Sequence, residues 1–147
     1  MLIDKATLTD INELSELLAI LFSQELEFKP DYHKQAAALY TIISSPDTGI
    51  ILVARDNGKL VGMVSLLFSV STALGGRVAL LEDMMVSPAE RGKGIGSDLL
   101  KAAIATAHEY DCQRITLLTD SNNKAAQQFY EAHDFAQSQM LAFRRQL

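Results

Sequence analysis

The stretch Val86-Ser87-Pro88-Ala89-Glu90-Arg91-Gly92-Lys93-Gly94-Ile95-Gly96 decides how this chain is interpreted. A mainly apolar run, Val78 to Val86, precedes it, and Ser97-Asp98-Leu99-Leu100 continues it with a helical pattern. Three glycines and two cations therefore lie where a strand passes into the N-terminus of a helix. Unpaired backbone N–H groups at such a terminus carry roughly half a positive charge from the helix dipole and bind anions. Because glycine has no Cβ, the backbone can approach a pyrophosphate closely.

The spacing of the glycines excludes two familiar phosphate loops. A Walker loop needs Gly-Lys followed by Ser or Thr, whereas Lys93 is followed by Gly94. A dinucleotide-binding loop needs Gly-x-Gly-x-x-Gly, whereas this loop reads Gly-x-Gly-x-Gly in mid-chain. Nucleotide hydrolysis is therefore disfavoured. A glycine-rich turn that only joins a strand to a helix is the structural alternative.

The pattern Arg91-x-x-Gly94-x-Gly96 resembles the coenzyme A pyrophosphate loop of the GNAT superfamily of N-acetyltransferases. Leu2 to Thr7 with Asp10 resembles the family's first strand and helix start, and Asn123 to Glu131 resembles its Asn-x-x-Ala-x-x-Phe-Tyr helix. Together these segments extend over nearly the whole chain. One departure is Asp134, which stands where the family usually has glycine. Aspartate tolerates the left-handed conformation expected at that helix end better than most residues do.

Length and composition indicate a single domain over residues 1–147. A net charge of −5 argues against binding of nucleic acid, which needs a concentrated positive face. No apolar run reaches the roughly 18 residues of a membrane span, and the N-terminus, with Asp4, shows no basic-then-apolar signal region. The single cysteine, Cys112, excludes an internal disulfide framework and agrees with a reducing compartment, so we expect a cytoplasmic protein.

Hydrophobic periodicity and turn residues predict elements in the order βααβββαβαβ. Expected strands are 2–7, 50–54, 60–70, 77–86, 114–119 and 136–143. A first helix is expected after a cap at Thr9 or Asp10, and three further helices are expected over 32–44, 94–110 and 123–132. This order implies an α+β (α/β-like) domain with a mixed, mostly antiparallel central sheet flanked by helices. The resemblance adds that the strand ending at Val86 and the strand at Arg114 splay apart, with the cofactor between them.

The resemblance implies acetyl-CoA (coenzyme A) as co-substrate and no metal. The residues expected to hold it are Arg91, Gly92, Lys93, Gly94, Ile95, Gly96 and Ser97 of the loop, backbone groups of Met84, Met85 and Val86, and Asn123, for which helix capping is the alternative role. The resemblance also places a strand irregularity at Met84 to Val86, which would aim a backbone N–H at the thioester oxygen. His33, His108 and His133 lack metal-ligand spacing, so structural or surface roles are expected.

Acetyl transfer to an amine requires that a proton leave the nitrogen. A free alkylamine has a pKa of about 10.4, so keeping it neutral at pH 7 costs roughly 4–5 kcal/mol, whereas a thiol with a pKa of about 8.5 leaves more easily. A base therefore matters more than an acid. Glu82 is the candidate base or water-positioning residue, and Asp83 would point to the opposite face of a regular strand. Tyr130 matches the family's tyrosine and is the candidate general acid, with packing against Phe129 as its structural alternative.

We expect a primary amine as acceptor, either a small metabolite or a protein amino group. The connection between the first two helices and the hairpin ends near Ser69 to Arg77 should select it. Glu25, Glu27 and Asp31 could attract a cationic acceptor, although a charged surface loop is the simpler explanation for them.

A non-catalytic acyl-CoA-binding module, which senses the cofactor or regulates a partner, is the alternative from another functional class. It would share the Arg91–Gly96 loop but would not need Glu82 or Tyr130. The apolar segment Ala136 to Phe143 could also join two copies of the chain in a homodimer. Arg144 and Arg145 beyond it are expected to be solvated, and Cys112 to be buried or inert.

Overall fold

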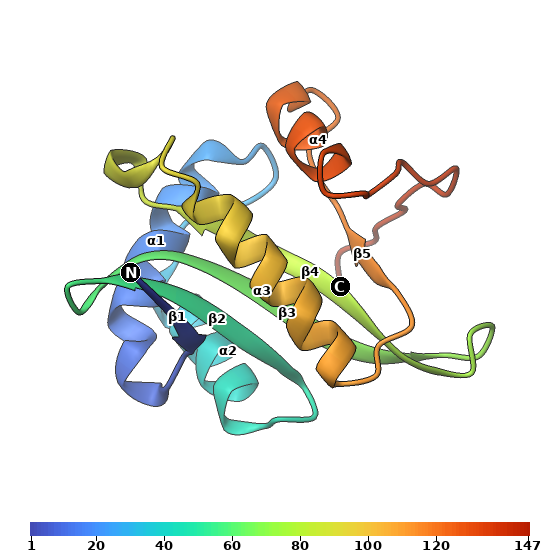
Figure 1. Cartoon of the computed structure of the whole chain (residues 1–147), viewed down its shortest axis with the longest axis horizontal. Helices are drawn as coiled ribbons and strands as arrows, with labels where there is room; N and C mark the ends of the chain where they lie inside the picture. Colours follow the sequence, from blue (N-terminus) through green and yellow to red (C-terminus); the bar gives the residue numbers. More distant parts are fainter.

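A computed structural model describes all 147 residues (Figure 1). Its elements are β1 (Leu2–Lys5), α1 (Ile11–Gln24), α2 (Tyr32–Ser44), β2 (Gly49–Asp56), β3 (Lys59–Ser71), β4 (Gly76–Val86), α3 (Ile95–Glu109), β5 (Ile115–Leu117) and α4 (Lys124–Glu131). Two 3-10 turns, η1 (Leu8–Asp10) and η2 (Pro88–Glu90), precede α1 and α3. The order matches the expected one as far as α4. None of the helices is long and apolar enough to cross a membrane.

The five strands form one mixed sheet in the order β1-β2-β3-β4-β5. The first three pairs are antiparallel and the β4–β5 pair is parallel, which confirms the mostly antiparallel sheet. The β2–β3 hairpin turns at Asn57-Gly58, whose φ angles of 51° and 80° suit a two-residue turn between Asp56 and Lys59. The α+β fold expected from the sequence is therefore confirmed.

Helices cover both faces of this sheet (Figure 1). Alternation along β2 directs Ile50, Leu52 and Ala54 toward α3 and Ile51 and Val53 toward α1 and α2. Each face thus has its own buried apolar cluster, one built on α3 and the other on α1 and α2. The central strands β3 and β4 are packed from both sides, so they form a rigid base for groups at their ends.

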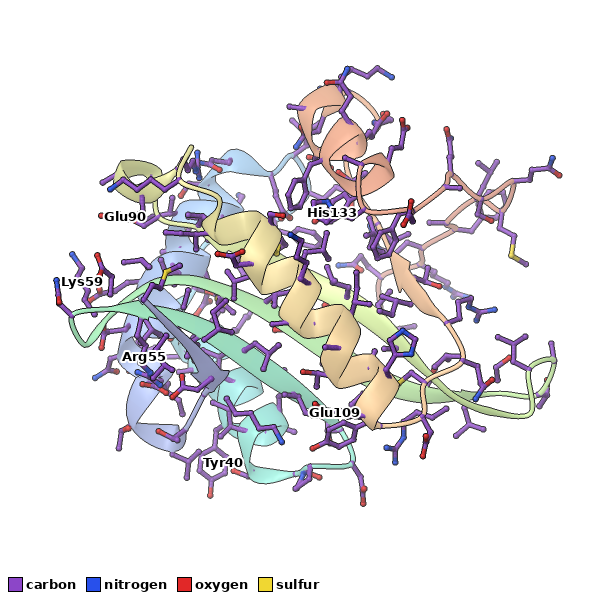
Figure 2. The ribbon with its side chains drawn as sticks, viewed as in Figure 1. Tyr40, Arg55, Lys59, Glu90, Glu109 and His133 are labelled. Atoms are coloured by element: carbon purple, nitrogen blue, oxygen red, sulfur yellow. The ribbon has the colours of Figure 1, made fainter.

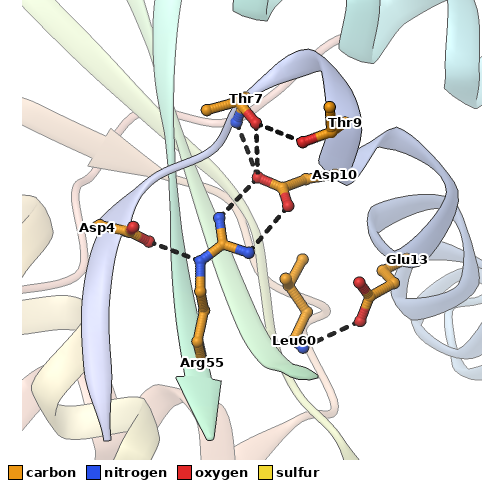
Figure 3. A network of polar contacts seen from close by, with 7 residues as sticks. All are labelled: Asp4, Thr7, Thr9, Asp10, Glu13, Arg55 and Leu60. Atoms are coloured by element: carbon orange, nitrogen blue, oxygen red, sulfur yellow. Dashed lines mark hydrogen bonds and ion pairs between the residues drawn. The ribbon is translucent and has the colours of Figure 1, made fainter. Parts of the chain in front are cut away.

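A partly buried ion-pair network fixes the start of α1 to the sheet (Figure 3). Arg55 donates to the two carboxylate oxygens of Asp10 at 2.9 and 2.7 Å and to Asp4 at 3.0 Å. Asp10 also accepts from the N–H of Thr7 at 2.8 Å. The hydrogen bonds from Arg55 hold the pKa of Asp10 below its usual range. The expected side-chain cap of α1 by Thr9 or Asp10 is absent. The carboxylate of Asp10 instead binds Arg55, and the hydroxyl of Thr9 forms a hydrogen bond with that of Thr7.

The segment Ala136 to Phe143 is not a strand, which corrects the expected closing strand of the sheet. Only three residues of β5 pair with β4, so the edge beyond β5 offers few hydrogen-bonding groups to another strand. The end of the chain instead meets the loop after α1, where Arg144 forms an ion pair with Glu27 and lies 5.9 Å from the centre of the Phe28 ring. We expected Arg144 to be solvated, but it forms an ion pair. The apolar side chains before it remain 81 to 94% exposed: Met140, Leu141 and Phe143.

Candidate active site

Strand β4 carries one extra residue at Asp83. Its ladder with β3 pairs Ser65 with Glu82 and Met63 with Met85, so three residue steps on β4 lie opposite two on β3. Asp83 has a φ of 53°, a left-handed conformation that aspartate adopts more readily than most residues. Such a bulge bends the strand and increases its twist. The expected strand irregularity is present, and it begins immediately before Met84.

Strands β4 and β5 separate beyond Leu81. Their parallel pairing joins Ala79 to Ile115, Leu80 to Thr116 and Leu81 to Leu117, and then ends. From Glu82 to Val86, backbone groups on the edge of β4 that faces away from β3 therefore have no strand partner. The expected splaying of these two strands is confirmed. It leaves free backbone donors and acceptors along β4, with α4 beyond them (Figure 1).

The loop before α3 presents a row of unpaired backbone donors. Gly92 and Gly94 have φ angles of 80° and 83°, and a Cβ at either position would meet no atom within 4 Å. The N–H groups of residues 92 to 97 have no acceptor within the protein. They lie at the positive end of the α3 dipole, while the side chain of Ile95, 5% exposed, anchors the helix in the core. This arrangement can bind an anion such as a pyrophosphate.

The two cations of the loop lie at its rim and contact the protein. Lys93 Nζ pairs with Glu90 at 2.7 Å, and this contact raises the pKa of Lys93. Arg91 Nε donates to the carbonyl oxygen of Val86 at 3.0 Å, and its Nη2 lies 3.8 Å from Sδ of Met85, itself a core residue. Arg91 thus braces the loop against the end of β4. Backbone N–H groups, rather than these side chains, form the body of the anion site.

Gly96, in the first turn of α3, faces the space between β4 and α4. A Cβ at this position would lie 3.6 to 3.7 Å from side chains of Met84, Val86 and Phe129. Met84 and Val86 belong to β4 beyond the bulge, and Phe129 belongs to α4. A larger side chain would fill this space, so glycine keeps open the route from the loop to the free edge of β4.

Helix α4 carries Tyr130, and Asn123 stands at its start. The ring of Tyr130 packs against Phe129 and Phe135, with centroids 5.3 and 5.8 Å apart, and burial raises the pKa of its phenol to about 12. The phenol therefore stays protonated at neutral pH and can donate a proton. Asn123 Oδ1 accepts from the N–H of Ala126 at 3.1 Å, so this side chain does cap α4 while its amide NH2 group remains exposed.

Asp134 ends α4 in the manner that its position predicts. Its φ is 67°, and the N–H of Phe135 donates to the carbonyl oxygen of Tyr130 at 3.1 Å. This is the pattern in which a left-handed residue, usually glycine, closes a helix. The departure from the family's glycine therefore leaves the end of α4 intact.

His133 joins α4 to the first turn of α3 (Figure 2). Its Nδ1 lies 2.9 Å from the carbonyl oxygen of Phe129, which can only accept, so Nδ1 carries the proton. The Nε2 atom of a neutral ring then accepts from the hydroxyl of Ser97 at 2.8 Å. The two residues are 36 apart in the chain, and no sequence signal connects them. Through this contact, the helix that carries Tyr130 is tied to the anion site.

Three carboxylates lie near one another beside the bulge. Glu82 lies opposite Ser65, so both side chains leave the face of the sheet that α1 and α2 cover. Burial, and then the negative charges of Glu82 and Glu25, raise the pKa of Asp83 to about 7. In a regular strand only one of Glu82 and Asp83 could lie on the face of the sheet that α1 and α2 cover. The bulge removes that restriction.

Two of the three acidic residues expected to attract an acceptor have structural partners. Glu27 forms the ion pair with Arg144, and Asp31 caps α2 by accepting from the N–H of Lys34 at 3.2 Å. Only Glu25 has no such partner.

Other titratable side chains show no second reactive centre. Burial raises the pKa of the Cys112 thiol, which keeps it protonated at neutral pH, as expected of an inert cysteine. His33 and His108 are exposed. No group of three or more His, Cys, Asp or Glu side chains is arranged to hold a metal ion.

Asp83→Asn should stabilise the fold at high pH. Because the pKa of Asp83 is raised to about 7 in the folded chain, from an ordinary value of about 3.9, this group lowers stability progressively as pH rises from 4 to 7. The variant lacks that loss and keeps a residue suited to the left-handed conformation. Urea unfolding at pH 8 should give a free energy of unfolding about 2–4 kcal/mol above wild type, with little difference at pH 4.

Asp111→Asn is the matched control, since Asp111 also has a positive φ, 58°, but is exposed. It should change stability by less than about 0.5 kcal/mol at either pH. Equal stability of wild type and Asp83→Asn at pH 8 would contradict the raised pKa.

Comparison with known proteins agrees with this geometry. Residues 11–135 match the model of the acetyltransferase (GNAT) family. An uncharacterized N-acetyltransferase of Bacillus subtilis, YhfO, is 31% identical over 80% of both chains. The aminoalkylphosphonate N-acetyltransferase of Salmonella typhimurium is 29% identical over 90% of this chain and 83% of that protein.

Solved structures share the whole fold. A protein of Agrobacterium tumefaciens, described provisionally as an acetyltransferase, superposes with a TM-score of 0.85 at 28% identity, over 99% of this chain and 100% of that chain. The glucosamine-6-phosphate N-acetyltransferase of Arabidopsis thaliana shares the fold alone, with a TM-score of 0.78 at 20% identity over 98% and 97% of the two chains. The chain therefore belongs to the acetyltransferase (GNAT) family and is an N-acetyltransferase.

Proposed function

We propose that this enzyme moves an acetyl group from acetyl-CoA to a primary amine by direct attack in a ternary complex. The observation that supports the proposal most is the row of unpaired N–H groups at residues 92 to 97, next to the opening between β4 and β5. An anion site that leads to a free strand edge suits a pyrophosphate attached to a long thioester arm.

The residues around this opening fit acetyl-CoA, which supplies the activated acetyl group as a thioester. Backbone N–H groups of residues 92 to 97 would hold the pyrophosphate, with Arg91 and Lys93 adding positive charge at the rim. Free backbone groups between Met84 and Val86 would pair with amides of the pantetheine arm. The exposed NH2 group of Asn123 can donate to the same arm.

The bulge at Asp83 gives the transferred carbonyl group a place to be stabilised. Backbone N–H groups of a bulged strand point away from the regular ladder, and those beyond Glu82 have no partner on β5. A fixed donor of this kind stabilises the negative charge that develops on the carbonyl oxygen.

Asp83 and Glu82 are the proposed route for the amine proton. The ammonium group first gives one proton to Asp83, directly or through a water held by Glu82. The neutral nitrogen then bonds to the acetyl carbon as the C–S bond breaks, and it releases its second proton to water. A base works best when its pKa is close to the working pH, which favours Asp83 as the proton acceptor. Tyr130 Oη then gives its proton to the departing sulfur.

Asp83→Asn should remove one ionisation from the pH profile of kcat/KM. In wild type, kcat/KM rises with pH and levels above about 7, because ionised Asp83 is the active form. The variant should lose this step and about ten- to a hundredfold of its activity, whereas Glu82→Gln should keep the step. An unchanged profile in Asp83→Asn, or loss of the step in Glu82→Gln, would return the role of base to Glu82.

Tyr130→Phe should lower kcat about ten- to a hundredfold, because the departing sulfur loses its proton donor. The affinity for acetyl-CoA should stay within about twofold, since the ring and its packing remain. Tyr40→Phe, on the exposed face of α2, is the control and should match wild type. Steady-state kinetics with calorimetric titration separates the two effects, and wild-type turnover in Tyr130→Phe would reject the role.

The relatives do not indicate one acceptor. They are named for aminoalkylphosphonate, thialysine and glucosamine 6-phosphate, which share an amine and differ in the charge of the remainder. We therefore propose only a primary amine here, on a small metabolite or a protein.

We further propose a cytoplasmic location, because the single cysteine agrees with a reducing compartment. A homodimer is also proposed, because the exposed apolar side chains of 136–143 would be covered in one.

Calorimetric titration with acetyl-CoA tests the co-substrate. Wild type should bind with micromolar affinity, and Gly94→Glu should abolish binding, because its carboxylate would occupy the anion site. Gly58→Glu is the matched control: Gly58 also has a positive φ, 80°, and open space around it, but it lies in the β2–β3 turn. Absence of binding by folded wild type, or equal binding by Gly94→Glu, would overturn the proposal.

A further inference from the structure

The hydroxyl of Ser97 lies between the anion site and a histidine. Ser97 belongs to the first turn of α3, and its backbone N–H is the last of the unpaired row at residues 92 to 97. Because Oγ is only a short covalent distance from that nitrogen, the hydroxyl lies beside the anion site. On its other side, Oγ lies 2.8 Å from Nε2 of His133, just beyond the end of α4. Both side chains are half-buried.

The carbonyl group of Phe129 fixes which nitrogen of the His133 ring carries a proton. A carbonyl oxygen only accepts, so Nδ1, which is 2.9 Å away, is the donor. In a neutral ring, Nε2 then has a lone pair and no proton. The hydroxyl of Ser97 has one proton and donates it to Nε2. Only the lone pairs of the hydroxyl oxygen are left for the anion site, where they would repel a phosphate oxygen.

Protonation of His133 reverses this hydrogen bond without moving either side chain. An imidazolium donates from both nitrogens, so Nδ1 keeps its bond to Phe129 while Nε2 donates to Ser97 Oγ. The hydroxyl proton is then free to point toward the anion site. Hydrogen bonds with an ionised partner are stronger than those between neutral groups. A bound phosphate therefore favours the charged ring, and by the same linkage the charged ring favours the bound phosphate.

We propose that His133 is a positioning residue for the co-substrate. It takes up a proton from solvent when a pyrophosphate binds, and this turns the Ser97 hydroxyl into a donor to a phosphate oxygen. The inference rests on the proposed function and adds a residue to the acetyl-CoA site. His133 acts through Ser97 and contacts neither the phosphate nor the reacting atoms.

The charged side chains around His133 do not already pair with it. The nearest in the chain are exposed: Asp98 and Lys101 on α3, and Glu131 and Asp134 on either side of His133. None of the protein's ion pairs involves His133. Tyr130, whose pKa is raised to about 12, stays neutral, and the side chains of β4 nearest Phe129, Met84 and Val86, are apolar. Ser97 and the bound anion therefore decide the charge of the ring.

Calorimetric titration with acetyl-CoA, repeated in buffers of different ionisation enthalpy, measures the protons taken up on binding. At pH 7, wild type should take up about 0.3–0.6 proton more than His133→Gln, whose amide can reach Ser97 but cannot ionise. The phosphates of acetyl-CoA and Asp83 titrate in both proteins, so the difference isolates His133. Ser97→Ala should show the same loss. His108→Gln, which changes an exposed histidine of α3, should match wild type.

Two further measurements separate this role from a merely structural one. His133→Gln should raise KM for acetyl-CoA about three- to tenfold at pH 6.5 and by less at pH 8.5, where histidine is mostly neutral. Its kcat should stay within about twofold of wild type, because the ring does not touch the reacting atoms. Nitrogen NMR of the wild-type ring should show a neutral ring with its proton on Nδ1 in the free protein at pH 7.5. With acetyl-CoA bound, the imidazolium signal should grow.

The outcomes separate this inference from the proposed function. Equal proton uptake by wild type and His133→Gln overturns the inference and leaves the acetyl-CoA site standing. So does a ring that stays neutral in the complex at pH 7, or one whose proton lies on Nε2 in the free protein. Absence of acetyl-CoA binding by folded wild type rejects the inference together with the proposed function.

Discussion

The extra residue at Asp83 is the constraint on which the site depends. By adding one residue to β4, the bulge turns the strand away from its regular course just where its pairing with β5 ends. That change frees backbone groups of β4 on one edge and releases Asp83, next to Glu82, from the alternation of a regular strand. The rest of the sheet, packed from both faces, holds this irregular segment in position. A regular strand would offer neither the free donors nor the paired carboxylates.

The two sides of the opening have opposite electrostatic character. On the α3 side, the unpaired N–H groups of residues 92 to 97 suit the anionic pyrophosphate. On the α1 side, burial and the negative charges of Glu82 and Glu25 raise the pKa of Asp83. Ser97 and His133 connect the loop to the end of the helix that carries Tyr130, so a hydrogen bond joins the proposed co-substrate site to the element of the proposed general acid.

Local signals explain what the sequence could predict. The turn at Asn57-Gly58, the loop of glycines before α3 and the apolar periodicity of α3 depend on neighbouring residues, and the structure contains the turn, the loop and the helix. The bulge at Asp83 has no glycine to mark it, and the Ser97–His133 contact joins residues far apart in the chain. The segment 136–143 ends in four consecutive apolar residues, as a buried strand can, but whether it pairs depends on distant contacts such as the shortness of β5 and the ion pair of Arg144 with Glu27. Long-range contacts of this kind leave no trace in a single sequence.

Amide hydrogen exchange with and without acetyl-CoA tests the central claim most directly, because it reports on the backbone groups themselves. The account predicts that binding slows exchange at residues 92 to 97 and between Glu82 and Val86, with little change in α2 or in the β2–β3 turn. Binding that leaves both segments as exchangeable as in the free protein would contradict it, since the co-substrate would then lie elsewhere on the fold.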